Sequence, residues 1–215
     1  MDEVWLRQEV IDTALAMSRE GLSPGTSGNV SVRFDDGMLI TPTGMAYDDL
    51  LPEDIVFVGM DGARREGERK PSSEWPFHLA AYEARAQARA VVHAHSLHAT
   101  VLACARKPIP AFHYMVAIAG GKDIPVCPYA TFGTKALAEN VGRALRNRKA
   151  CLMANHGQIA CEATLQEALA LAREVEFLAA QYVQLLQIGE VHILDDAEMA
   201  RVLERFAGYG QQDGT

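Results

Sequence analysis

The chain has 215 residues, of which 49% are hydrophobic and 22% are charged, and its formal net charge at pH 7 is −8. This composition is typical of a globular protein and excludes a wholly disordered chain. The negative charge argues against a nucleic-acid-binding surface and against a polybasic membrane anchor, because both need clustered positive charge.

The beginning of the sequence carries no sign of export. Met1-Asp2-Glu3-Val4 is acidic and lacks the basic and apolar regions of a signal peptide. No stretch approaches the ~20 apolar residues that a membrane span needs. The four cysteines form no CxxC pair, so they are expected to be reduced thiols. We therefore expect a cytoplasmic protein with a single domain over residues 1–215.

The first half of the chain contains helix and strand patterns separated by loops. Apolar residues at helical spacing predict a helix over 4–17 that ends near Gly21, and a glycine-containing loop follows to Asn29. Strands are predicted over 30–34, 38–40 and 55–58, with a hairpin turn at 35–37. The segment 71–76 is typical of a helix start with a serine N-cap and a proline in the first turn, and this helix is predicted to end near residue 85.

The second half continues this mixture of strands and helices. A strand over 90–95 is followed by a helix to residue 104, and further strands are predicted over 124–127, 151–154 and 159–161. A capping-box pattern at 164–167 begins a long helix to about residue 186, and Asp195 caps a last helix over 196–206. Short turns join several strands, so we predict an α/β fold with a central mixed or antiparallel β-sheet flanked by helices.

A pair of histidines lies on one predicted strand. His93 and His95 are two residues apart, so they point to the same side of a strand and could bind one metal ion. The alternative is that they are ordinary packed histidines, because such a short pattern is not specific. His156, at the end of another strand, could supply a third nitrogen, and Glu74 could supply a carboxylate oxygen. These four residues are our candidate metal ligands.

Three short polar segments could form an anion-binding pocket: residues 26–29, 41–44 and 72–73. Their glycines would let backbone N–H groups approach an anion closely, and their hydroxyl and amide groups add hydrogen-bond donors. The alternative is ordinary turn chemistry, because the same residue types are common in loops.

The lysines argue against Schiff-base chemistry. That chemistry needs a lysine in an apolar pocket, which lowers the pKa of its amine. None of the five lysines lies within an apolar strand. If the protein stabilises a carbanion, a metal ion is therefore the expected device.

Together these motifs resemble the class II aldolase/adducin family, in order and with compatible spacing over nearly the whole chain. The matching strings are Gly-Leu-Ser-Pro-Gly-Thr-Ser-Gly-Asn-Val-Ser-Val-Arg at 21–33, Ile-Thr-Pro-Thr-Gly at 40–44, Pro-Ser-Ser-Glu at 71–74, Val-His-Ala-His at 92–95, Ile-Pro-Ala-Phe-His-Tyr at 109–114, Pro-Tyr-Ala-Thr-Phe-Gly-Thr at 128–134, Asn-His-Gly at 155–157, and the tail around Phe206 and Tyr209. The combination is far more specific than any single motif.

The resemblance implies a role for each matching residue. The residues matching the family's metal site, which binds one Zn²⁺ per subunit, are Glu74, His93, His95 and His156. Glu74 would also be the base that transfers a proton. The residues matching the phosphate pocket are Thr26, Gly28, Asn29, Thr43, Gly44, Ser72 and Ser73. Tyr114 would act as general acid and base from a neighbouring subunit, and Phe132, Phe206 and Tyr209 would border the aldehyde pocket.

One position departs from the family's pattern. Asn155 stands where a second histidine is expected, directly before His156. Alternation along the strand would point Asn155 away from the metal.

The function implied by the resemblance is a zinc-dependent aldolase that forms a cyclic homotetramer with active sites at subunit interfaces. It would cleave L-fuculose 1-phosphate reversibly to dihydroxyacetone phosphate and L-lactaldehyde through an enediolate stabilised by the metal. Alternatives with the same chemistry are cleavage of 5-deoxyribulose 1-phosphate or 5-methylthioribulose 1-phosphate. The family also includes pentulose-phosphate 4-epimerases, which carry an aspartate in place of Glu74, a dehydratase branch with a longer architecture, and non-enzymatic adducin-like binding modules.

Overall fold

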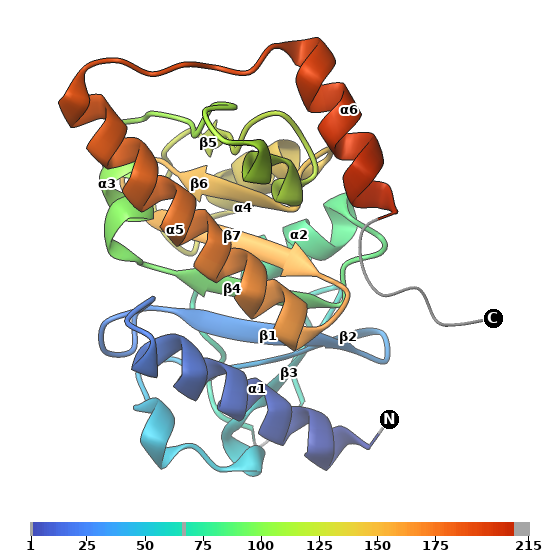
Figure 1. Ribbon diagram of the computed structural model, residues 1–215. Coiled ribbons are helices and arrows are strands. Elements are labelled where there is room, and N and C mark those ends of the chain that lie inside the picture. Colours follow the sequence, from blue (N-terminus) through green and yellow to red (C-terminus); the bar gives the residue numbers. More distant parts are fainter. Residues whose placement is uncertain (1, 66–67, 209–215) are drawn as a thin grey trace.

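The computed structural model describes residues 2–65 and 68–208, which contain one seven-stranded sheet (Figure 1). The strand order is β3-β2-β1-β4-β7-β6-β5. Neighbouring strands pair antiparallel except for β5 and β6, which are parallel, so the predicted mixed sheet is confirmed. The strands are β1 (Asn29–Phe34), β2 (Gly37–Ile40), β3 (Val56–Gly59), β4 (Ala90–Ala94), β5 (Val126–Cys127), β6 (Ala150–Met153) and β7 (Gly157–Glu162).

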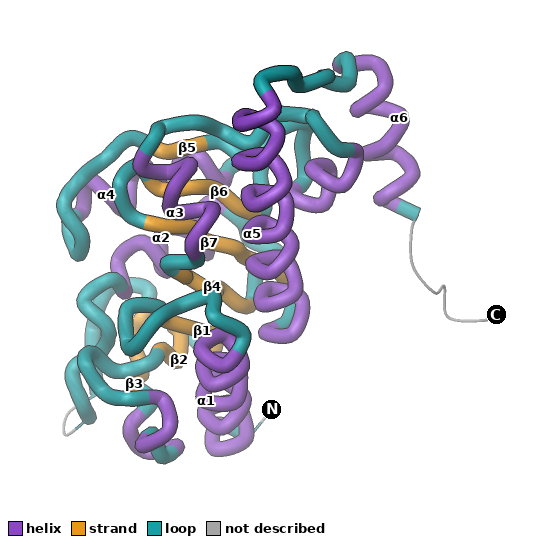
Figure 2. Tube along the Cα trace, turned by 60° about the vertical axis from the view of Figure 1, so that its left-hand side comes forward, coloured by secondary structure: helices purple, strands orange, loops and turns teal. Residues whose placement is uncertain are grey.

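Helices cover both faces of this sheet, as Figure 2 shows. The helices are α1 (Glu3–Arg19), α2 (Trp75–Ala84), α3 (Leu97–Cys104), α4 (Lys135–Leu145), α5 (Leu165–Ile188) and α6 (Asp196–Ala207), of which α6 packs on the 3₁₀ helix at Tyr114–Ala119. Because side chains alternate along a strand, Val92 of β4 packs in the core shared with α1, α3 and α5, whereas Val91 packs in the core shared with α2 and α4. The sheet is therefore the middle of three layers.

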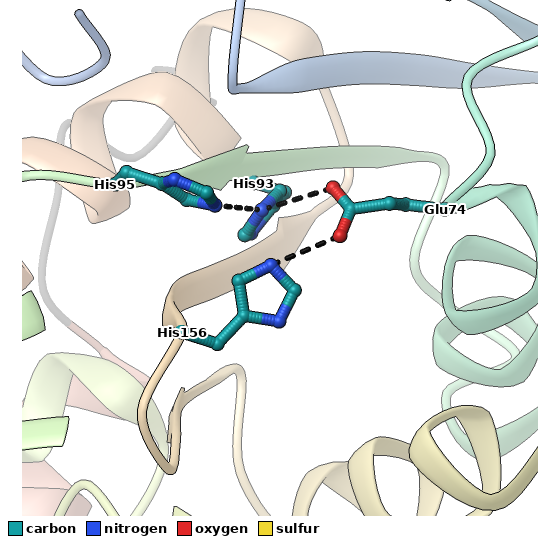
Figure 3. A group of neighbouring side chains, drawn as sticks. All are labelled: Glu74, His93, His95 and His156. Atoms are coloured by element: carbon teal, nitrogen blue, oxygen red, sulfur yellow. Dashed lines mark hydrogen bonds and ion pairs between the residues drawn. The ribbon is translucent and has the colours of Figure 1, made fainter. Parts of the chain in front are cut away.

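The start of α2 differs from the prediction. The predicted serine N-cap is wrong, because Glu74 occupies the N-cap position and the helix begins at Trp75. Ser72 instead forms a turn, in which its hydroxyl accepts a hydrogen bond from the backbone N–H of Glu74 at 3.3 Å and its carbonyl accepts one from Trp75. This turn places Glu74 just before the helix, with its side chain directed at the end of β4 (Figure 3).

Helix α4 was not among the predicted helices, although Thr134 caps it by accepting a hydrogen bond from the backbone N–H of Leu137. The other predicted helices are confirmed within a few residues. Thr164 caps α5 and Asp195 caps α6, each through its side-chain oxygen. None of the helices in the described part of the chain is long and apolar enough to span a membrane.

Candidate metal centre and its cavity

The four candidate metal ligands lie together at one end of the central strands (Figure 3). His93 lies on β4, opposite Asn29 of β1, and His95 directly follows β4. His156 lies in the turn between β6 and β7. One ligand atom from each of these histidines and from Glu74 lies within 4.8 Å of the others. The structure therefore brings the two histidines of this strand together with His156 and Glu74.

The hydrogen bonds of His93 indicate a cation site. Its Nδ1 lies 2.7 Å from the backbone carbonyl of Gln158, so Nδ1 carries a proton and donates it. A neutral imidazole then presents a lone pair at Nε2, which lies 3.0 Å from His95 Nε2 and 3.2 Å from Glu74 Oε2. Lone pairs this close repel one another unless a cation lies among them. A proton on one nitrogen removes the repulsion within one pair of atoms, whereas a metal ion accepts lone pairs from all the ligand atoms at once.

Glu74 is ionised and held from several sides. It is 6% exposed, and its Oε1 lies 2.9 Å from His156 Nε2 while its Oε2 accepts a hydrogen bond from the Asn29 amide at 2.9 Å. Burial raises the pKa of this carboxyl, but the electrostatic influence of the neighbouring His93 and His156 outweighs burial and holds the pKa well below its usual range.

The pKa of His95 is shifted in the direction that metal binding requires. Burial, together with the neighbouring His93 and His156, lowers this pKa to about 4. His95 is therefore neutral at pH 7, and only the neutral imidazole can donate a lone pair to a metal ion. The donor set of three imidazoles and one carboxylate fits a divalent cation such as Zn²⁺.

The cluster opens into a cavity of about 340 Å³. This cavity is lined by all the residues predicted for the phosphate pocket, namely Thr26, Gly28, Asn29, Thr43, Gly44, Ser72 and Ser73, and by Phe132. Two glycines make this arrangement possible. A Cβ on Gly28 would lie 2.8 Å from the backbone oxygen of His93, and Gly44 has a left-handed φ of +69°. Three loops that are distant in sequence therefore meet beside the metal ligands.

Ser27 and Pro42 line the cavity as members of the predicted segments 26–29 and 41–44, whereas Tyr129 and Ala130 line it from outside the predicted anion-binding segments. Each lies inside or beside a motif quoted above, so the motifs contained the signal. Asn155 also borders the cavity, and its side-chain oxygen accepts hydrogen bonds from Arg106, so the expectation that it points away from the metal stays a prediction whose premise does not hold. β6 ends at Met153, and Asn155 has a left-handed φ of +55°, which breaks the alternation on which that expectation relied.

The residues predicted for the acid–base and aldehyde roles lie at two separate places on the protein. Tyr114 and Phe206 line a second groove of about 780 Å³, between the 3₁₀ helix at Tyr114–Ala119 and α6, while Phe132 lies at the first cavity. Tyr114 is 52% exposed. Tyr209 lies outside the described residues. Within the described part of the chain, no lysine lines the metal cavity.

Comparison with known proteins gives consistent results. The sequence model described as "Class II Aldolase and Adducin N-terminal domain" matches residues 8–183. L-fuculose phosphate aldolase from Escherichia coli K12 is 54% identical over 211 residues, which are 98% of each chain. A 5-methylthioribulose-1-phosphate/5-deoxyribulose-1-phosphate aldolase from Rhodospirillum rubrum is also 54% identical, over 95% of this chain and 92% of that protein. A solved L-fuculose 1-phosphate aldolase superposes with a TM-score of 0.90 at 44% identity, covering 94% of this chain and 96% of that chain.

Proposed function

Since the chain belongs to the class II aldolase and adducin family, we propose that it cleaves L-fuculose 1-phosphate reversibly to dihydroxyacetone phosphate and L-lactaldehyde. The observation that carries this proposal is the cavity that the three polar loops share with Glu74, His95 and His156, while the buried His93 completes the group of candidate ligands. A metal next to an anion pocket suits a substrate that has a phosphate on one carbon and carbonyl and hydroxyl oxygens on the next two. An adducin-like binding module needs no such metal-binding set.

We assign the metal as Zn²⁺, held by His93, His95 and His156, with Glu74 as the fourth ligand in the resting enzyme. When bound, it would act as a Lewis acid that withdraws electron density from the carbonyl and hydroxyl oxygens of the substrate. The phosphate would lie against the three loops, where hydroxyl and backbone N–H groups donate hydrogen bonds without a fixed positive charge.

Glu74 would move the proton at C3 of dihydroxyacetone phosphate. Its carboxylate is ionised and borders the cavity, so it can accept a proton from a carbon atom beside the metal. This role requires Glu74 to leave the metal when substrate binds.

Tyr114 would exchange the proton of the C4 hydroxyl, and it would do so from a neighbouring subunit. Tyr114 and Phe206 share an exposed groove that is distinct from the metal cavity. A homotetramer in which this groove of one subunit meets the metal cavity of the next would complete each site.

The alternative candidate substrates differ from L-fuculose 1-phosphate in the aldehyde that cleavage releases. The two 54%-identical relatives differ in their named substrates, one acting on fuculose phosphate and the other on methylthioribulose or deoxyribulose phosphate. The products differ by a hydroxyl or a methylthio group, and an apolar pocket discriminates weakly between such groups. The same metal and phosphate chemistry serves all three substrates.

A cleavage assay with L-fuculose 1-phosphate, 5-deoxyribulose 1-phosphate and 5-methylthioribulose 1-phosphate tests the proposal. Dihydroxyacetone phosphate is followed by coupled reduction, with a chelated and a zinc-restored control. The proposal expects release that needs zinc and the largest kcat/KM on L-fuculose 1-phosphate. A larger kcat/KM on another substrate would transfer the assignment to that aldehyde, and no release from any of them would refute aldolase activity.

A further inference from the structure

A chain of buried polar side chains runs behind the metal centre and ends on Glu74. The Tyr82 hydroxyl lies 2.8 Å from Ser31 Oγ, and Ser31 Oγ lies 2.7 Å from His78 Nδ1. His78 Nε2 lies 2.5 Å from Asn29 Oδ1, and Asn29 Nδ2 donates to Glu74 Oε2 at 2.9 Å. Tyr82, Ser31 and His78 are 0% exposed. None of these three lines the cavity, and their hydrogen-bonded path to Glu74 runs through Asn29.

The charge of Glu74 sets the direction of every hydrogen bond in this series of side chains. An ionised carboxylate can only accept, so the amide of Asn29 must turn its NH₂ group toward Glu74 and its oxygen toward His78. His78 must then donate from Nε2, and a neutral imidazole that donates from Nε2 accepts at Nδ1. Ser31 must therefore donate to Nδ1 and accept from the Tyr82 hydroxyl.

The reverse direction is unfavourable in the described structure. If His78 carried its proton on Nδ1, its Nε2 lone pair would face the Asn29 oxygen. Turning the amide to avoid that contact would place the amide oxygen against the Glu74 carboxylate. Either arrangement sets two acceptors against each other in a buried site, where an unpaired polar group is costly. One tautomer of His78 is thus coupled to one orientation of Asn29.

Ring packing holds His78 in place for this role. The Phe77 ring stacks on it with centroids 5.1 Å apart and an interplanar angle of 18°. Phe77 also contacts His93, with centroids 5.1 Å apart and an interplanar angle of 75°. Burial lowers the pKa of His78 to about 3, so it remains neutral at pH 7. The neutral and tightly packed His78 therefore donates to the Asn29 amide, which in turn contacts Glu74.

We propose that His78 is a positioning residue for the metal centre, which acts through Asn29 and is oriented by Ser31. Its Nε2–H fixes the Asn29 amide, so that a single N–H donor always faces Glu74. Because an amide does not relay protons, this series of hydrogen-bonded side chains holds the Glu74 carboxylate in place and transfers no proton. The part of this inference that concerns proton exchange rests on the proposed function, whereas the tautomer and the effect on metal binding do not.

Nitrogen NMR of protein labelled with ¹⁵N-histidine tests the tautomer directly. The signals of His78 are assigned by their loss in His78→Gln. We expect a neutral ring protonated at Nε2 in both the metal-free and the zinc-loaded protein. In Ser31→Ala the donor to Nδ1 is lost and the Nδ1–H form is expected to appear, whereas Tyr82→Phe leaves the Ser31 hydroxyl in place as a matched control. A wild-type His78 protonated at Nδ1, or at both nitrogens, overturns the proposal.

Zinc affinity and proton exchange test the consequence. His78→Phe keeps an aromatic ring against Phe77 but has no donor, and we expect zinc affinity and the kcat for exchange of the C3 proton of dihydroxyacetone phosphate to fall about tenfold or more. His78→Gln carries an N–H at similar reach and should recover most of both losses, with KM for dihydroxyacetone phosphate little changed.

Equal values for the two His78 variants would overturn the proposal, because a purely structural role gives no advantage to glutamine. If His78→Phe does not fold, Ser31→Ala takes its place in the zinc measurement. If wild-type enzyme lacks exchange altogether, the proposed function fails, while the tautomer and the zinc affinity still decide this inference.

Discussion

Gly157 is the position where a single added carbon should damage the metal centre most directly. It begins β7 and follows the ligand His156. A Cβ on Gly157 would lie 2.5 Å from the backbone oxygen of Ala94 and 3.0 Å from Cδ2 of His95. The first contact is with the backbone of β4, so the strain cannot be relieved by rotating a side chain.

Gly157→Ala must therefore separate β4 from β7 at the point where their histidines converge. Overpacking of this kind costs about 1–3 kcal/mol. Since 1.4 kcal/mol corresponds to a factor of ten in binding, we expect zinc affinity to fall roughly 10–100-fold. Competition with a chromophoric chelator measures that affinity, and urea denaturation of the metal-free protein measures the loss of stability.

Gly142→Ala in α4 is the matched control. Its Cβ would lie 3.5 Å from Ala80, which is an ordinary contact. Replacing glycine inside a helix should stabilise the protein by about 0.5–1 kcal/mol and leave zinc affinity unchanged. Wild-type zinc affinity in Gly157→Ala would refute the reasoning, because it would show that β4 and β7 can separate without moving the ligands.

Three further predictions address the ligands, the second groove and the buried histidine. His95→Ala should lose most of its zinc by elemental analysis, and full occupancy would disprove the ligand assignment. Tyr114→Phe should slow carbon–carbon cleavage more than exchange of the C3 proton, and equal losses would indicate a merely structural tyrosine. The pKa of His78 falls from 6.5 to about 3 on folding, so the unfolded chain binds a proton first as the pH drops. Stability of the metal-free protein should therefore decrease by about 2 kcal/mol more between pH 7 and pH 5 in wild type than in His78→Phe, and parallel curves would contradict the burial argument.

Much of the site could be predicted because its motifs are local in sequence. His93 and His95 share one side of a strand by simple alternation, and the strand ends where the predicted loop over 21–29 meets β1. The residues alone could not establish that the four candidate metal ligands lie together in space. The antiparallel pairing of β4 with β7 brings His156 beside His93, and the bridge between Pro42 and Pro71 and the hydrogen bond from Asn29 hold Glu74 next to them. The resemblance supplied that information in advance.

The wrong predictions have local physical causes. Ser72 was expected to cap α2, but its hydroxyl closes a turn before the helix, and Glu74 takes the capping position with its side chain committed to the metal ligands. For Asn155 only the premise was wrong, because β6 ends at Met153 and strand alternation does not extend to this residue. The chain Tyr82–Ser31–His78–Asn29 could not have been predicted from spacing, because it joins a helix to a neighbouring strand through side chains alone.

The origin of the ligands has a kinetic consequence for the enzyme. Glu74, the β4 histidines and His156 come from three segments that meet only when β4 has paired with β7. The unfolded chain therefore offers zinc at most the local His93–His95 pair, and the ion stabilises the native state by mass action. If the transition state of folding lacks the β4–β7 pairing at this end of the sheet, the ion will slow unfolding and leave the folding rate almost unchanged. The metal would then lengthen the lifetime of the folded sheet.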